Sequence, residues 1–181
     1  MSAPASVPFT YRDYARLRDD RRYEVIEGKL FLTPSPRTWH QRTSLNLALV
    51  LAEHVRANSL GEVLEAPCDV VLSETNVVQP DILFVAKERL SIIEEKYVSA
   101  APDLVIEILS PGTQARDRKL KFRLYARFGV RELWIVDVPA GTVEVFENTD
   151  ERLQLVSRLG KGDILRSAVL PKLRIALDAI F

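Results

Sequence analysis

Hydrophobic residues recur at helical spacing over one long stretch of the chain. Between about Thr38 and Asn58, the residues Leu45, Leu49, Ala52 and Val55 follow one another three or four positions apart. This spacing predicts a long amphipathic helix with these residues on its apolar side.

Runs of valine, isoleucine and leucine follow this helix and predict strands. Three of them cover residues 61–73, 77–85 and 102–110, and two further strands are expected at 131–138 and 142–148. Because the runs are almost continuously apolar, both faces of the sheet should be covered. The pattern therefore predicts an α/β (α+β) fold in which a central mixed β-sheet is flanked by helices.

Shorter patterns describe the N-terminal part. Alternating residues around Gly28 predict a hairpin at 21–34, and Thr10 can cap a short helix that reaches about Leu17. Residues 1–9 are small and proline-rich, so we expect a flexible tail. The remaining residues, 10–181, are then expected to form a single domain, in agreement with a length of 181 residues.

Composition narrows the class of protein. Hydrophobic residues make up 47% and charged residues 28% of the chain, as in an ordinary globular protein. No segment reaches the roughly 18 apolar residues of a membrane span. Cys68 is the only cysteine, and the first residues lack the basic start and apolar centre of an export signal. We therefore expect a cytoplasmic protein that does not contact a membrane.

The charges balance overall but not locally. The 25 lysines and arginines match 25 aspartates and glutamates, which argues against binding nucleic acid through bulk charge. Residues 116–131, however, contain seven basic residues and one acid. Such a run is usually a solvated helix face, but it could equally hold a phosphate backbone. The candidate nucleic-acid-binding residues are Arg116, Arg118, Lys119 and Arg123.

An acidic residue interrupts the apolar run LVIEIL, in a strand expected at the centre of the sheet. An unpaired buried carboxylate is costly, so this residue, Glu107, needs a metal, a solvent-filled cleft or a cation such as a strand-end arginine. Asp81 opens the preceding strand, and by itself would more often serve a turn. Neighbouring strands lie about 4.8 Å apart, so Asp81 and Glu107 could share one Mg²⁺ or Mn²⁺. Asp103 lies about 13 Å from Glu107 along its strand, too far to share that ion.

A lysine lies toward the sheet on a second predicted helix, residues 114–128, which Gly129 can cap. At about 100° per residue, Lys121 lies beside the inward stripe that Leu124 defines. Its ammonium could orient an attacking water or stabilise charge on a phosphate. Alternatively, it could reach water or pair with Asp117 one turn earlier.

A histidine lies at the start of the first helix. His40 could contact a phosphate or relay a proton, although a histidine in this position more often bonds to backbone. His54 lies about 21 Å further along the helix, so the two do not form a zinc pair. The sequence contains no phosphate-binding glycine loop, paired CxxC motif or GxSxG elbow, which leaves kinase, zinc-ribbon and serine-hydrolase classes without support.

Several of these pieces occur together in one known family. Gln79-Pro80-Asp81, then PDLVIEILSPGT, then RDRKLKFRLYARFGVRELWIVDV resemble the Uma-two-like putative restriction endonucleases of the PD-(D/E)XK nuclease superfamily. RYEVIEGKL and the helix entered at His40 extend the resemblance over roughly residues 10–148.

The resemblance implies a restriction-endonuclease-like core with the hairpin as an N-terminal extension. It also implies a metal held by Asp81, Glu107 and the main-chain carbonyl of Ile108. The lysine expected two residues after the glutamate is replaced by Leu109, and Lys121 on the following helix is its proposed substitute. Glu24 matches a family-like stretch and could be an extra acid near the metal, or could form a cross-strand salt bridge.

The expected function is therefore that of a Mg²⁺- or Mn²⁺-dependent endonuclease, a hydrolase that cleaves phosphodiester bonds of nucleic acid, with DNA as the expected substrate. Its catalytic residues would be Asp81, Glu107 and Lys121, with Glu24, His40 and Asp117 as supporting candidates. A non-catalytic nucleic-acid or protein binding module on the same fold is the alternative. A homodimer is expected, because short α/β domains often dimerise through an exposed face. No separate recognition domain is visible, so sequence specificity is expected either to depend on dimerisation or to be absent.

One stability prediction follows from the acidic pair. If the metal-free carboxylates crowd one another, Glu107→Gln should raise the melting temperature of the metal-free protein.

Overall fold

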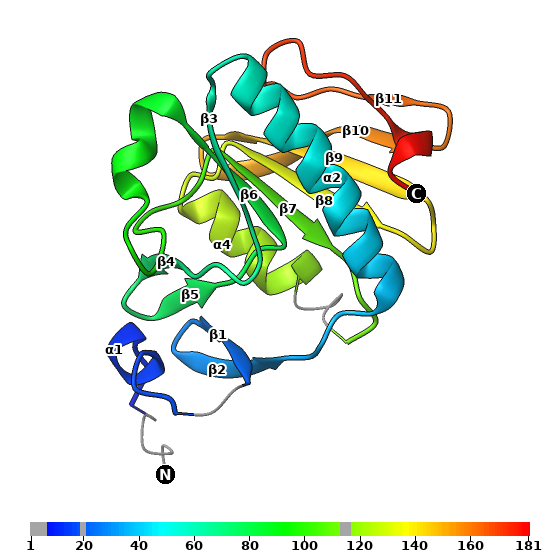
Figure 1. The fold of residues 1–181 in the computed structure, drawn as a ribbon. Coiled ribbons are helices and arrows are strands. Elements are labelled where there is room, and N and C mark those ends of the chain that lie inside the picture. Colours follow the sequence, from blue (N-terminus) through cyan, green and yellow to red (C-terminus); the bar gives the residue numbers. More distant parts are fainter. Residues whose placement is uncertain (1–6, 19–20, 113–116) are drawn as a thin grey trace.

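A six-stranded mixed sheet forms the centre of the molecule (Figure 1). The computed structural model describes residues 7–18, 21–112 and 117–181, except for the side chain of Asp117. The strand order is β10-β9-β8-β7-β6-β3, and only β7 and β8 run parallel. The strands are β3 (Gly61–Glu65), β6 (Ile82–Ala86), β7 (Leu104–Ile108), β8 (Glu132–Asp137), β9 (Thr142–Thr149) and β10 (Arg152–Gly160). In the described part of the chain, no helix is long and apolar enough to cross a bilayer.

Helices cover the two faces of this sheet. The long helix α2 (Thr38–Ala57) packs on one face, and the π-helix η2 (Asp117–Lys121) leads into α4 (Phe122–Arg127) on the other. Because side chains alternate along a strand, β7 directs Ile106 toward α2 and Val105 toward α4. Both sides of β7 are therefore buried, as its continuous apolar run predicts.

The predicted hairpin belongs to a smaller second sheet. Its strands are β1 (Arg22–Ile26), β2 (Lys29–Thr33), β4 (Val70–Ser73) and β5 (Asn76–Val78), in the order β2-β1-β5-β4. Glu27 and Gly28 both have positive φ, the geometry of a type I′ hairpin turn. The predicted cap Thr10 accepts a hydrogen bond from the Asp13 N–H, although helix α1 (Tyr11–Tyr14) ends earlier than expected.

Two predicted strands are each divided between the two sheets. The run 61–73 forms β3 and β4, separated around Pro67, and the run 77–85 forms β5 and β6, separated around Pro80. Proline has no N–H to donate to a ladder, so each run leaves one sheet at its proline and enters the other. Asp81 consequently lies at the crossing point, directly before β6.

The apolar side predicted for α2 is partly wrong. Leu45 and Leu49 are 52% and 61% exposed, whereas Leu47, Leu51 and Val55 are buried. The inward side of α2 also includes His40, Thr43 and Ser44, so it is polar at its N-terminal end. The sequence pattern failed because the helix directs polar residues, rather than its outer leucines, toward that end of the sheet.

The C-terminal part contains elements that the sequence pattern did not separate. Strand β10 was missed because polar residues interrupt its apolar positions, and it pairs only with β9, at the edge of the sheet. The chain then adds leucines and isoleucines to the core beneath α2. The short elements of the chain are the 3-10 helix η1 (Lys87–Ile92), β11 (Ile164–Leu165), β12 (Ile175–Ala176) and η3 (Leu177–Ala179).

Candidate functional site

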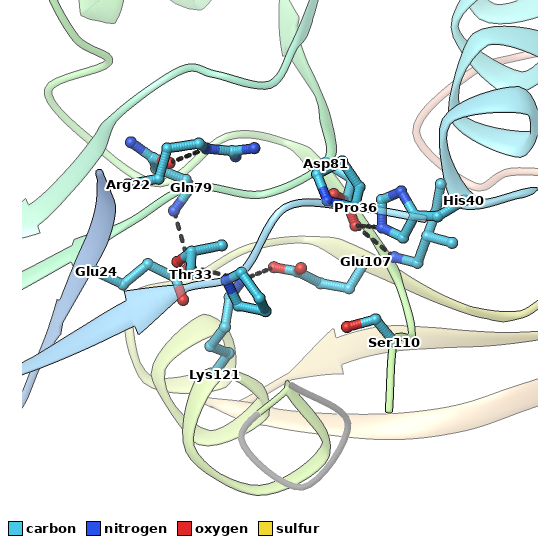
Figure 2. A pocket seen from close by; sticks show the side chains of 12 residues that line it. Arg22, Glu24, Thr33, Pro36, His40, Gln79, Asp81, Glu107, Ser110 and Lys121 are labelled. Carbon is cyan, nitrogen blue, oxygen red and sulfur yellow. Dashed lines mark hydrogen bonds and ion pairs between the residues drawn. The ribbon is translucent and has the colours of Figure 1, made fainter. Parts of the chain in front are cut away.

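Two carboxylates lie side by side where β6 begins and β7 ends. The antiparallel register pairs Ile82 with Ile106, so its continuation places Asp81 opposite Glu107. Asp81 Oδ2 accepts a hydrogen bond of 2.7 Å from the Ile108 N–H, which fixes Asp81 beside the end of β7 (Figure 2). The side chains of Asp81 and Glu107 are 18% and 4% exposed. This carboxylate pair is therefore recessed from the surface.

The Lys121 ammonium reaches this carboxylate pair from η2, which lies on the face of the main sheet opposite α2. Its Nζ lies 2.5 Å from Glu107 Oε1 and 2.9 Å from Glu24 Oε1, and the side chain is 3% exposed. Lys121 thus provides the cation that a buried Glu107 requires, instead of a strand-end arginine or a lysine directed to water. Lys121 is the last residue of a π-helical turn, a distortion frequent at functional sites.

A tyrosine donates to the same carboxylate oxygen. Tyr125 OH lies 2.5 Å from Glu107 Oε1 and is completely buried. Burial, followed by the negative charge of Glu107, holds the pKa of Tyr125 well above its usual value, so the phenol stays a donor. Sequence reasoning gave Tyr125 no role. Its spacing of four residues after Lys121, on one helix face, was the available signal.

Glu24 joins the site from β1. The residue directly across the hairpin from it is Phe31, which carries no charge, and Glu24 forms an ion pair with Lys121. Glu24 Oε1 also accepts the Gln79 N–H at 3.0 Å, which ties the hairpin to the segment before Asp81. The small sheet therefore forms one wall of the site. Gln79 belongs to the motif that carries the family resemblance, but sequence reasoning gave it no role in the site.

His40 approaches from the first turn of α2. Its Nε2 lies 3.3 Å from Asp81 Oδ2, and the ring is buried. Figure 2 shows His40 and Asp81 next to each other beside Pro36. His54, in contrast, contacts the Pro171 carbonyl oxygen at 3.0 Å, so the two histidines share no site.

The carboxylates line a small cavity of about 40 Å³. This volume accommodates a few water-sized particles. Asp81 and Glu107 contribute carboxylates, Ile108 also lines the cavity, and Asp81 Oδ1 accepts no hydrogen bond from any described residue. Mg²⁺ and similar hard cations need only one or two carboxylates plus other oxygens, so these residues fit such an ion. Among the residues with described side chains, no three histidine, cysteine or acidic residues form a larger metal cluster.

The predicted nucleic-acid-binding residues lie in different environments. Arg118 lies 2.5 Å from the buried Glu144 on β9, and Arg158 binds the same carboxylate. Burial raises the pKa of Glu144, but hydrogen bonds from Arg158 and Arg118 outweigh it and leave this pKa below its usual value. Lys119 and Arg123 are exposed on the outer side of the helix. Arg116 and the side chain of Asp117 lie outside the part that the structure describes.

The structure thus combines a mixed sheet between two helical layers with recessed acids at the end of its central strands. The chain belongs to the Uma2 family, described as "Putative restriction endonuclease", whose model matches residues 10–178. The predicted family and fold class are thereby confirmed.

Two proteins are similar to this chain over nearly its whole length, one in structure and one in sequence. A crystal structure from Anabaena variabilis, described as a putative nuclease belonging to DUF820, superposes with a TM-score of 0.79 at 19% identity and covers 96% of this chain and 98% of that chain. An uncharacterized protein of Synechocystis, slr1290, is 24% identical over 168 residues, which are 91% of this chain and 85% of the relative.

Proposed function

We propose that this protein is a divalent-metal-dependent endonuclease of the PD-(D/E)XK type, which hydrolyses phosphodiester bonds of DNA. The observation that carries the proposal is the recessed pair Asp81 and Glu107 with the Lys121 ammonium 2.5 Å from Glu107. Membership of the Uma2 family supports the same class of reaction.

Three groups would hold the metal: the Asp81 and Glu107 carboxylates and the main-chain carbonyl of Ile108. A bound Mg²⁺ or Mn²⁺ supplies neutralisation of phosphate charge and a more acidic water. Lys121 places a positive charge beside Glu107, where it stabilises the negative charge that develops on an attacked phosphate.

Neighbouring side chains hold these groups in position. Tyr125 fixes the Glu107 carboxylate, and Glu24 holds Lys121 from the other side. His40 orients Asp81 through its Nε2, which lies 3.3 Å from Asp81 Oδ2.

DNA binding and dimer formation are further parts of the proposal. Lys119 and Arg123 are exposed cations on the helix that carries Lys121, so they can contact backbone phosphates. Neutralising both should weaken DNA binding for all sequences alike and reduce its salt dependence. The homodimer remains a prediction, which light scattering after size exclusion tests.

The decisive experiment is cleavage of supercoiled plasmid and of single-stranded DNA with Mn²⁺, Mg²⁺ or EDTA. We expect metal-dependent nicking that is lost in Glu107→Ala and Lys121→Ala. The matched controls are Glu62→Ala and Lys161→Ala, because both side chains are exposed and line no part of the cavity.

Each other outcome has a defined meaning. Full activity of Lys121→Ala would contradict the role of the lysine while leaving the metal pair intact. Absence of cleavage with every metal, together with no metal-induced rise in Tm, would contradict the endonuclease proposal and favour the binding module.

A further inference from the structure

A larger cavity opens from the pocket at Asp81. Its volume is about 350 Å³, within the range of small-ligand pockets. It shares four lining residues with the pocket that contains Glu107, so the two pockets adjoin; the shared residues are Arg22, Pro36, His40 and Asp81. We call the larger part the side groove, and its remaining lining residues are Gln41, Ser44, Glu65, Ala66 and Pro67.

The side groove lies between the N-terminal part of α2 and the end of the main sheet where β3 ends and β6 begins. The Ala66 N–H donates to the Asp81 carbonyl oxygen at 2.9 Å, so the groove adjoins the main chain of a proposed metal ligand. Glu65 is paired with Ile82, whose side chain packs on the α2 face of the sheet. In Figure 2, Pro36 and His40 lie beside Asp81, where the two hollows meet, whereas Arg22 lies next to Gln79.

Apart from Arg22, whose Nε donates to Gln79 Oε1 at 3.0 Å, the groups in the side groove favour a neutral hydrogen-bonding ligand. Ser44 Oγ donates to Glu65 Oε1 at 2.9 Å and thereby orients this carboxylate from α2. Glu65 Oε2 accepts no hydrogen bond from any described residue, so it can receive one from a ligand. The Gln41 amide is exposed and offers both a donor and an acceptor.

The lining of the side groove suits a nucleobase better than a phosphate. A carboxylate repels a second phosphate, whereas it accepts a hydrogen bond from an exocyclic amino group such as that of cytosine. Proline side chains at Pro36 and Pro67 add apolar surface on which a base can rest. A base amino group would therefore donate a hydrogen bond to the Glu65 carboxylate, with the flanking phosphate directed toward Asp81.

We propose that the side groove binds one unpaired nucleobase that carries an exocyclic amino group, such as cytosine or adenine, next to the phosphate that is cleaved. This inference rests on the proposed endonuclease function and specifies its substrate class. A paired base is stacked inside the duplex and cannot enter a groove unless it is extruded, at a cost of a few kcal/mol. The substrate is therefore single-stranded DNA or an unpaired segment.

The test uses oligothymidylates that contain a single dC or dA, each as a single strand and as a duplex. We expect wild-type protein to cleave the single strand about tenfold faster than the duplex, at the bond beside the dC or dA. Glu65→Gln should reduce the preference for that bond to about that for thymidine, because its amide no longer offers a charged acceptor. Glu62→Gln, an exposed residue of the same strand outside the groove, should keep the wild-type preference.

A binding measurement distinguishes an error in the proposed base binding from an error in the proposed endonuclease function. Fluorescence anisotropy in EDTA compares five-nucleotide oligomers with and without the dC or dA. Equal cleavage of duplex and single strand would contradict base binding in the side groove but not the endonuclease function. An unchanged bond preference in Glu65→Gln would have the same meaning. If no DNA is cleaved with any metal, base-dependent binding that Glu65→Gln loses still supports the groove, and absence of such binding overturns it as well.

Discussion

Two donors meet at a single oxygen atom of Glu107. Lys121 Nζ and Tyr125 OH both lie 2.5 Å from Glu107 Oε1, in a region from which water is almost excluded. The negative charge of the Glu107 carboxylate is therefore compensated by the protein itself. A buried charge that is paired and hydrogen-bonded in this way is held in a defined position.

This geometry reverses the stability effect expected for Glu107→Gln. The sequence-based expectation of a higher Tm assumed repulsion between empty carboxylates, but Glu107 is paired with Lys121. We expect the amide to weaken a buried ion pair at a cost of about 2 kcal/mol. Such a loss lowers the Tm of the metal-free protein by about 4–8 °C. Scanning fluorimetry in EDTA measures it, and a higher Tm than wild type would restore the crowding explanation.

At the scale of elements, two ion pairs join the helical layer to the main sheet. Lys121 connects η2 to Glu107 on β7, and Arg118 connects the same helix to Glu144 on β9. Because Arg118 and Lys121 lie three residues apart, one turn of η2 carries both contacts. The register of this turn on the sheet therefore determines where the Lys121 ammonium lies.

The Arg118–Glu144 contact predicts a stability effect that depends on pH. The folded-state pKa of Glu144 is below the usual value of 4.5, so its contribution is present above about pH 4.5 and is lost as the pH falls through the lowered pKa. We expect Glu144→Gln to be less stable than wild type at pH 7, by a difference that shrinks below pH 4. Urea denaturation at both pH values measures this, and an equal difference at the two would contradict it.

At the scale of the whole molecule, the C-terminal residues complete the core beneath α2. Leu165, Leu170, Leu177 and Ile180 are fully buried against the main sheet and α2. The helix that carries His40 therefore depends on the last residues of the chain for part of its packing.

Loss of this packing should destabilise the whole fold. Leu177 is 0% exposed, so Leu177→Ala leaves a cavity and should cost about 2–5 kcal/mol. Chemical denaturation of the purified variant measures the loss. Leu155→Ala is the matched control, because that leucine is 52% exposed, and similar losses in the two variants would contradict this role of the C-terminal core.

The sequence alone determined the local elements and part of the site. Apolar periodicity predicted the long helix, the strands at 102–110 and 131–138 and the hairpin, because these patterns depend on neighbouring residues. The adjacency of Asp81 and Glu107 followed from the tendency of consecutive strands to pair. The inward direction of Lys121 followed from helical geometry.

Only the tertiary structure decided which of these elements meet. The division of two apolar runs between two sheets, the outward direction of Leu45 and Leu49, and the arrival of Glu24 and His40 at the carboxylate pair were not determined by local pattern. These contacts join residues far apart in the chain, and they form only when packing of the whole core pays for the loop closure that brings them together. The two carboxylates could thus be predicted from the sequence, whereas the residues that surround them are determined by the packing of the two sheets and α2.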